Sequence, residues 1–468
     1  MSENIDQQII SSKIIKSDSF VSLKLSPNDW IIPSSSTISC IYFYDIQQWS
    51  LFKREANEIF MNVERLTSSL QLLLKFYPLL NGTFKVFDTD NQVSLEYEEN
   101  RGGILFVSTL VNIPLSDLPV TVDKYTDTKK IPESLQLINS FQPDHLLHIR
   151  HTRFSCGSVA LGISLNHQIA DAHSYFQLID HWRQLYRDDN YQPDVCHQRS
   201  FLEPTDEEIQ QLQTSNPGFD NRRSLAYNEE IPNTSLPTKQ TVVKVFRFSN
   251  DELQRMKSNA TAHLSSDIHY LSTFEVLTAH LFQHVMLARY HSALSTSLQS
   301  KLYISTNTRS RLVQPTIPTS YFGNAIMLSY SEMMLNDVLN VDSLSSIAGR
   351  AHKSIEENTS YDIRTTLAWI VCQKDKAKIR PTWHSETTDF TISAWNKMGM
   401  YTGSEFESGV CACRIILPPD VNFNGAAILL STEEDDGSID VFLGLEVNEM
   451  DRLEKNSDFR KYSLKSNR

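Results

Sequence analysis

Two side chains four residues apart, His167 and Asp171, are the strongest candidates for chemistry in this sequence. Histidine has an unperturbed pKa of about 6.5, so at neutral pH it can take a proton from a hydroxyl or an amine. Such a base is what an acyl transfer from a thioester needs. Asp171 has two interpretations, because it can orient or pair with a neighbouring charge, or cap the helix that follows it. The spacing alone does not decide between a catalytic and a structural role.

The elements around His167 place it at a corner between a strand and a helix. Residues 158–165, SVALGISL, are typical of a buried strand, and His167 follows directly after it. Apolar side chains then recur at helical spacing on one face of a predicted helix. They are Ala172, Tyr175, Phe176, Ile179, Trp182 and Leu185. Loops held between rigid elements often present functional groups, which favours His167 as a site residue.

The rest of the chain predicts a mixed α/β (α+β) fold with two similar halves. Runs of β-branched and aromatic residues predict strands, and apolar repeats at helical spacing predict helices. The expected strands are 38–45, 83–87, 92–97, 104–109, 146–154, 158–165, 241–248, 301–306, 324–330, 389–394, 410–417, 426–431 and 438–445. The expected helices are 63–74, 172–185, 250–260, 272–290, 342–357 and 361–374. The residues before 38 are interpreted as a polar leader.

Composition suggests where the chain divides. Residues 196–240 are rich in Pro, Asn, Asp, Glu and Ser, which is typical of a segment between domains. We therefore expect an N-terminal domain of residues 1–195, a crossover linker of 196–240 and a C-terminal domain of 241–468. A length of 468 residues is more than one ordinary core accommodates, which agrees with two domains.

Charge and hydropathy exclude several classes of protein. The net charge of −13 leaves no general positive field for a phosphate backbone, so we expect no nucleic acid partner. The first thirty residues contain no continuous apolar signal core, and no uncharged stretch reaches the roughly 20 apolar residues of a membrane span. We therefore expect a cytoplasmic monomer without a membrane partner.

Two other groups of residues could suggest a metal, but neither forms a complete site. Cys411 and Cys413 share one face if they lie on a strand, yet two ligands without partners make a weak site, and the six cysteines are interpreted as reduced thiols. His280 and His284 are four apart on a predicted helix but lack the glutamate of a His-Glu-x-x-His zinc motif. We expect no metal.

Several further motifs accompany the His-x-x-x-Asp segment, in a fixed order along nearly the whole chain. They are Leu25-Ser26-Pro27-Asn28-Asp29, Tyr77-Pro78-Leu79-Leu80-Asn81-Gly82, Ser272-Thr273-Phe274-Glu275, Thr308-Arg309-Ser310-Arg311-Leu312 and Tyr321-Phe322-Gly323-Asn324. Each is weak alone, but jointly they are specific. The set resembles the BAHD acyltransferases, the plant and fungal CoA-dependent family.

This resemblance implies two chloramphenicol-acetyltransferase-like domains with an active-site tunnel between them. An acyl-CoA co-substrate would enter one mouth and a small alcohol or amine the other, meeting at His167 as general base, with no permanently bound cofactor. Asp171 would be mainly structural. Ser393 and Trp395 match a Ser/Thr-x-Trp segment and would line the acceptor side or donate to the oxyanion. For Trp395 a purely packing role in the core stays open.

One family motif is degenerate here. Where relatives carry Asp-Phe-Gly-Trp-Gly, this chain has Ser404-Glu405-Phe406-Glu407-Ser408-Gly409. We expect Glu405 to replace the missing aspartate and to pair with Arg309 as a structural contact. The degenerate motif also motivates an alternative, a noncatalytic relative that binds a ligand or partner. An enzyme with peptide-carrier donors is a further option, although such enzymes usually have a second histidine at position 166.

Overall fold

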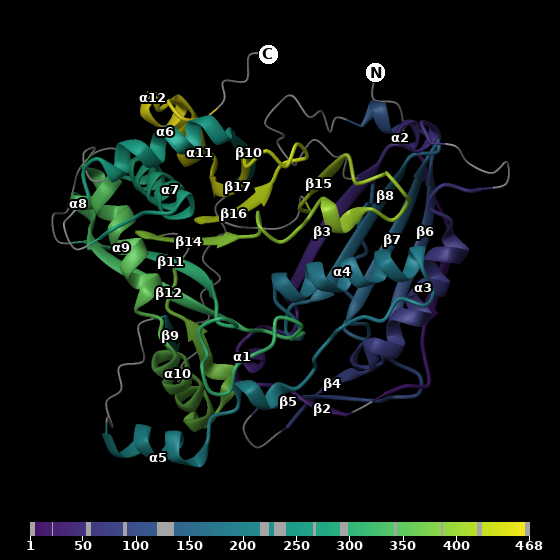
Figure 1. Cartoon of the computed structure of the whole chain (residues 1–468), viewed down its shortest axis with the longest axis horizontal. Coiled ribbons are helices and arrows are strands. Elements are labelled where there is room, and N and C mark those ends of the chain that lie inside the picture. Colours follow the sequence, from purple (N-terminus) through teal and green to yellow (C-terminus); the bar gives the residue numbers. More distant parts are fainter. Residues whose placement is uncertain are drawn as a thin grey trace.

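The computed structural model describes most of the chain (Figure 1). The described residues are 5–20, 22–52, 58–87, 91–118, 135–215, 224–228, 240–264, 268–290, 298–340, 344–384, 387–418 and 424–463. Two parts of the expected linker, 216–223 and 229–239, lie outside them. Among the described residues no helix is both long enough and apolar enough to cross a membrane.

A six-stranded sheet forms the first half of the molecule, on the right in Figure 1, in the order β1-β6-β7-β8-β3-β15. Its strands are β1 (Gln7–Ile15), β6 (Ile104–Val111), β7 (Leu147–Phe154), β8 (Val159–Asn166), β3 (Thr37–Tyr44) and β15 (Arg414–Ile416). Helices α3 (Val63–Phe76) and α4 (Ala172–Arg187) cover one face. Leu66, Leu70 and Trp182 belong to the apolar cluster that joins these helices to the sheet.

A second six-stranded sheet has the order β10-β17-β16-β14-β11-β12. Its strands are β10 (Thr241–Phe248), β17 (Ile439–Glu446), β16 (Ala426–Ser431), β14 (Asp389–Ala394), β11 (Gln299–Asn307) and β12 (Ile326–Met334). The helices that flank it are α6 (Asn250–Thr261), α7 (Thr273–Arg289), α8 (Leu335–Leu339), α9 (Leu344–Glu356), α11 (Val447–Lys455) and α12 (Ser457–Arg460). Helix α7 is buried nearly all round because it packs against α6, α8, α9 and α11 as well as the sheet.

Smaller elements complete the molecule. A three-stranded sheet has the order β2-β5-β4, and β9 pairs with β13. The bounds are β2 (Leu23–Lys24), β4 (Thr83–Val86), β5 (Val93–Glu96), β9 (Leu225–Tyr227) and β13 (Ile379–Pro381). The remaining α-helices are α1 (Pro27–Trp30), α2 (Ile46–Ser50), α5 (Asp206–Ser215) and α10 (Ser360–Cys372).

Strand β15 connects the two halves. It lies in the last quarter of the sequence, yet it pairs antiparallel with β3, with Arg414 opposite Phe43 and Ile416 opposite Ile41. The first sheet therefore contains a strand from the segment expected to form the C-terminal domain.

The expected mixed α/β fold is confirmed, and each expected strand and helix has a counterpart. The prediction that the residues before 38 form a polar leader is wrong in part, because Gln7–Ile15 forms β1 and pairs along its length with β6. An edge strand is hydrogen-bonded on one side only, and Ile9, Ile10 and Ile14 are exposed. This strand therefore lacks the alternation of burial that makes a strand visible in a sequence.

Candidate active site

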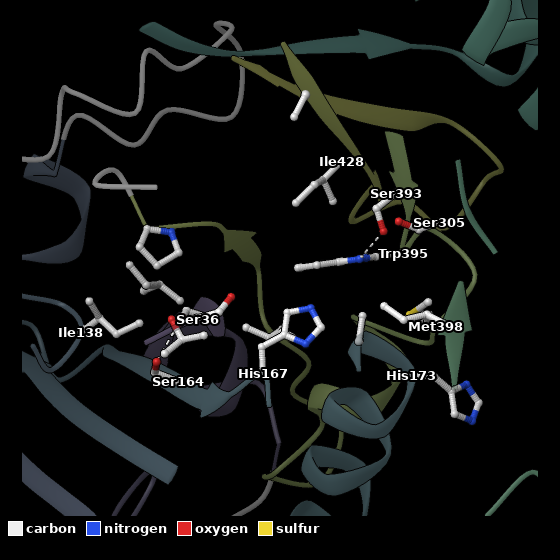
Figure 2. Close-up of a pocket in the computed structure, with 18 of the residues that line it drawn as sticks. Ser36, Ile138, Ser164, His167, His173, Ser305, Ser393, Trp395, Met398 and Ile428 are labelled. Carbon is white, nitrogen blue, oxygen red and sulfur yellow. Dashed lines mark hydrogen bonds between the residues drawn. The ribbon is translucent and has the colours of Figure 1, made fainter. Parts of the chain in front are cut away.

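A cavity of about 1200 Å³ lies between the two large sheets, and His167 lines it (Figure 2). One wall comes from β3, β8 and the segment 135–141. The opposite wall comes from β11, β14 and β16. The cavity brings together the first and second halves of the chain at the predicted base.

His167 follows the last residue of β8, which the buried apolar run of the strand positions. Its main-chain N–H donates to the Ser36 carbonyl at 2.8 Å, which ties the corner to the segment before β3. Burial lowers the pKa of His167 below its ordinary value of 6.5, and the charge of Asp171 and nearby acceptors offset burial only in part. The imidazole is therefore neutral at pH 7, the state that a general base requires.

Asp171 is the N-cap of α4, and its side chain is fully used by structural contacts. Its two oxygens accept from Arg309 at 2.8 and 3.0 Å, from the Ser174 N–H at 3.0 Å and from the Ala325 N–H at 2.9 Å. Burial alone raises the pKa of Asp171, but Arg309 outweighs it and the net shift is downward. The carboxylate is therefore ionised and bound on all sides, and it has no free lone pair directed at His167.

Arg309 joins the second half of the chain to this corner. Besides Asp171, its guanidinium donates to the Tyr321 and Gly323 carbonyls, each at 3.1 Å, and to the Ser174 hydroxyl at 2.9 Å. Gly323 also leaves room for a second arginine, because a Cβ at this position would lie 2.6 Å from an Arg199 nitrogen. The Arg-Ser-Arg-Leu and Tyr-Phe-Gly-Asn motifs thus meet at the start of α4.

Ser393 and Trp395 face His167 from the opposite wall (Figure 2). The Trp395 indole N–H donates to the Ser393 hydroxyl oxygen at 3.0 Å, and the ring packs edge-on against Phe176 with centroids 5.9 Å apart. Because Ser393 accepts from Trp395, its own O–H remains able to donate. Trp395 therefore lines the cavity as well as packing in the core.

The expected pair between Glu405 and Arg309 is wrong. Glu405 lies 3.3 Å from Arg187 and accepts from the Gly409 N–H at 2.8 Å, whereas Arg309 pairs with Asp171. The reason is the length of α4, which separates its two ends by about 24 Å at 1.5 Å per residue. Glu405 sits at the C-terminal end and Arg309 at the N-terminal end, so neither side chain can reach the other.

The degenerate segment packs against the far end of α4. Phe406 is buried and lies edge-on to Trp182 at 4.7 Å and to Tyr186 at 5.7 Å. Glu407 accepts from the Tyr186 hydroxyl at 2.6 Å and from the Met61 N–H at 2.9 Å. The segment therefore holds α4 against the first sheet and lies away from the cavity.

Several residues of the site were not singled out from the sequence. Arg199, in the expected linker, lies 3.0 Å from Asp29, and both side chains are almost fully buried. Nothing in the local sequence distinguishes this arginine from a surface charge. The hydroxyls that line one arm of the cavity were also missed, because serine and threonine are frequent in loops and strand ends. They are Ser35, Ser36, Thr37, Ser39, Ser140 and Ser164.

The two groups that could suggest a metal are the pair His280 and His284 and the pair Cys411 and Cys413, and the side chains of both pairs are packed in the protein. His280 is buried against Phe459, and the His284 ring lies 2.8 Å from the His280 carbonyl. Burial lowers the pKa of both imidazoles. Burial also raises the pKa of Cys413, to about 11, and that of Cys411. The part of the chain that the structure describes contains no cluster of three or more His, Cys, Asp or Glu that could hold a metal ion.

Comparison with known proteins shows the family of this chain. Residues 4–460 match the family model described as Transferase family, the BAHD acyltransferases. The chain belongs to this family. It is 24% identical over 435 residues to shikimate O-hydroxycinnamoyltransferase of Nicotiana tabacum, covering 91% of this chain and 93% of the relative. It is 25% identical over 448 residues to hydroxycinnamoyl-CoA:5-hydroxyanthranilate N-hydroxycinnamoyltransferase HHT1 of Avena sativa, with the same coverage.

A solved structure agrees on the fold. The chain matches F. graminearum TRI101, complexed with coenzyme A and T-2 mycotoxin, with a TM-score of 0.73 and 15% identity, covering 95% of this chain and 99% of that one. The resemblance inferred from the motifs is therefore confirmed, and with it the two-domain, chloramphenicol-acetyltransferase-like fold.

Proposed function

We propose that this protein transfers an acyl group from an acyl-CoA thioester to a hydroxyl or an amine of a small molecule, with His167 as the general base. The observation that carries this proposal is that His167 lines a cavity of about 1200 Å³ between the two halves. Burial lowers the pKa of His167, which favours the neutral imidazole that a base requires. Curated relatives are named for transfer to oxygen and to nitrogen, so both kinds of acceptor fit the family. Acyl-CoA acts as a co-substrate, and no permanently bound cofactor is needed.

The chemistry follows from the two facing walls. His167 takes the proton from the acceptor, whose oxygen or nitrogen attacks the thioester carbonyl and forms a tetrahedral oxyanion. The Ser393 O–H donates to that oxyanion, and Trp395 orients Ser393 through its indole N–H. The intermediate then breaks its carbon–sulfur bond. The proton held by His167 passes to the thiolate of CoA, so the base returns to its neutral form.

Asp171 and Arg309 act as a structural pair in this scheme. The carboxylate is engaged by four donors, so it neither accepts the substrate proton nor relays one from His167. Its pairing with Arg309 fixes the start of α4 relative to the Tyr321–Asn324 segment. We propose that this contact keeps His167 in place across the junction of the two halves.

We further propose that the protein works as a monomer in the cytoplasm. Residues from both halves of one chain line the cavity, so a second copy is not required to complete it. All six cysteines are unpaired, as expected in a reducing compartment. Light scattering of the purified protein and localisation of a tagged copy test the two statements.

The deciding experiment incubates the purified protein with a panel of acyl-CoAs and of small alcohols and amines while free thiol release is followed. We expect thiol release that depends on an acceptor, and a 10²–10⁴-fold lower rate for His167→Ala with its fold intact. His263→Ala, an exposed histidine outside the cavity, is the control and should be unaffected. Absence of turnover with every pair would favour the noncatalytic alternative.

A further inference from the structure

One of the buried arginines differs from the others in its partners. In the described part of the chain four arginines are buried, and three of them, Arg199, Arg309 and Arg364, lie within 3.0 Å of a carboxylate oxygen. The fourth is Arg150 on β7, which is 6% exposed and pairs with none of the described aspartates or glutamates. Burial lowers the pKa of Arg150, but a guanidinium stays protonated at neutral pH. Arg150 is therefore a buried positive charge that no described residue neutralises.

Two neutral amides on segment 135–141 hold Arg150. Its Nε atom donates to the Asn139 Oδ1 atom at 2.9 Å, and a terminal nitrogen donates to the Gln136 Oε1 atom at 3.3 Å. Both amides belong to residues that line the cavity. The segment lies directly on the sheet here, because a Cβ at Gly162, the residue of β8 opposite Arg150, would be 2.0 Å from a carbonyl oxygen of the segment. The positive charge thus lies behind one wall of the cavity.

The wall in front of this charge offers donors and no anions. None of the described residues that line the cavity is an aspartate or a glutamate, although the chain contains 56 of them. Arg150 only donates, so it turns the Gln136 oxygen toward itself and leaves the amide nitrogen to donate elsewhere. Ser164 also lines the cavity, and it accepts from the Ser39 hydroxyl at 2.8 Å, so its own O–H is able to donate. A negatively charged group meets complementary atoms at this wall.

We propose that this wall binds a carboxylate carried by one of the two substrates, and that Arg150 determines the preference for it. The Gln136 amide N–H donates to the carboxylate, while Arg150 polarises the amide and supplies the opposite charge from behind. A buried charge is unfavourable without a partner, so an anionic ligand stabilises the site in a way that a neutral ligand does not. The anion belongs either to a hydroxy acid as acceptor or to a dicarboxylic acid as acyl group. This inference rests on the proposed function and narrows its substrates.

The first experiment compares matched substrates. Each acidic acceptor is tested beside its methyl ester, for example 3-hydroxybenzoate beside methyl 3-hydroxybenzoate, and malonyl-CoA is tested beside propionyl-CoA. We expect kcat/KM to be about 10–100-fold higher for the acid in one of the two series, the gain of a hydrogen bond to a charged group. The series that shows this preference identifies the substrate that carries the carboxylate. Equal or lower values for the acids in both series would overturn the proposal.

The variant Gln136→Glu tests the charge while the segment stays bound. Glutamate accepts from Arg150 as glutamine does, but it supplies the missing negative charge from within the protein. We expect the preference for the acid to fall about 10–100-fold, mainly through the KM of the acid, without a lower Tm. Gln142→Glu is the control, because Gln142 is exposed and is not among the described lining residues. A preference that survives in Gln136→Glu would contradict the proposal.

Replacement of the arginine separates charge from packing. Loss of an anchor for the segment affects acid and ester alike, whereas loss of the charge affects the ratio between them. We expect that ratio to fall in Arg150→Met and to be largely retained in Arg150→Lys, which keeps the charge. Arg153→Met is the control on the same strand, because Arg153 donates to the Phe60 carbonyl at 2.7 Å and is not among the described lining residues. A loss of equal size for acid and ester in Arg150→Met would leave Arg150 with a structural role alone.

The inference and the proposed function fail in different ways. Thiol release without a preference for either acid contradicts the inference and leaves the function standing. If no pair of substrates turns over, calorimetric titration with 3-hydroxybenzoate and with its methyl ester measures binding directly. We expect the acid to bind more tightly than the ester to the unaltered protein, and this difference to be lost in Gln136→Glu. Equal affinities for the unaltered protein would overturn the inference.

Discussion

Helix α4 has an arginine–carboxylate pair at each end, and the two pairs differ in burial. At the N-terminal end, the side chains of Arg309 and Asp171 are 4% and 1% exposed. At the C-terminal end, those of Arg187 and Glu405 are 37% and 28% exposed. A buried charge that loses its partner is left uncompensated, whereas water and salt screen an exposed pair. Charge therefore fixes the end near His167, and aromatic packing around Phe406 fixes the other.

The difference explains how the degenerate motif can be tolerated. The segment around Glu405 lies about 24 Å from the start of α4, and its buried part is the apolar ring of Phe406. A carboxylate at the exposed end contributes little, so its exact position is weakly constrained. Displacing the carboxylate of Asp171, in contrast, would disrupt four hydrogen bonds and leave the buried Arg309 without its partner.

The largest effect is expected at the buried end. Asp171→Ala leaves the Arg309 guanidinium without its partner and should lower the free energy of unfolding by about 3–5 kcal/mol. Thiol release should fall as well, because the corner that carries His167 loses its tie to the second half. Urea unfolding and turnover measure the two effects. Asp180→Ala, a partly exposed carboxylate on the same helix, is the control, and an equal loss in both variants would break the comparison.

Phe406→Ala tests the other end. Removing a buried aromatic ring should lower the free energy of unfolding by about 3–5 kcal/mol, as large core deletions do. Because this end lies away from the cavity, kcat/KM for each folded molecule should stay within about twofold. Turnover well below the unfolding temperature checks this. A loss of rate as large as that of Asp171→Ala would mean that both ends serve catalysis.

The pH dependence of the rate sharpens the comparison further. Burial lowers the pKa of His167 below 6.5, so the base is neutral above that pKa and becomes protonated below it. The rate should therefore fall as the pH is lowered, with an apparent pKa under 6.5, in a profile of kcat/KM between about pH 5 and pH 8. Glu405→Gln, at the far end of α4, should leave this limb unchanged. A shift in that variant would show coupling along the helix.

The smallest effect is expected for the exposed pair. A double-mutant cycle on Glu405→Gln and Arg187→Met should give a coupling energy below about 1 kcal/mol in thermal unfolding, and less in high salt. A parallel cycle on Glu405→Gln and Arg309→Met should be additive, since the two residues pair with different partners. Strong coupling in the second cycle would indicate that Glu405 and Arg309 interact after all, contrary to the structure.

Much of this fold could be predicted because local patterns carry it. The strand before His167 and the helix after it have the apolar periodicity that burial on one face requires, and both were found near their observed bounds. Helix α5 was missed although Thr205 and Glu208 form reciprocal main-chain contacts of the kind made in a capping box. The sequence around α5 is rich in proline and acidic residues and resembles a linker, so the capping pattern was not recognised as the start of a helix.

The site was predicted less completely than the fold. The motifs gave the family correctly and predicted His167 as the base, but a motif gives the order of residues and not which of them meet. Arg309 was assigned the wrong carboxylate because the sequence does not show that α4 separates Glu405 from it. Asn324 was found as part of a motif, yet its contact with His167 depends on the packing of two halves. The division at residues 195 and 241 stays a prediction.

The pairing of β15 with β3 has a consequence for how the chain folds as it is synthesised. Residues 41–43 of β3 pair with residues 414–416 of β15, which are synthesised about 370 positions later. Until that segment leaves the ribosome, β3 presents an open edge of unpaired N–H and C=O groups, which other strands can join. Folding of the first sheet is therefore completed only near the end of translation. A truncation before residue 414 should expose this edge and promote aggregation of an otherwise well-formed half.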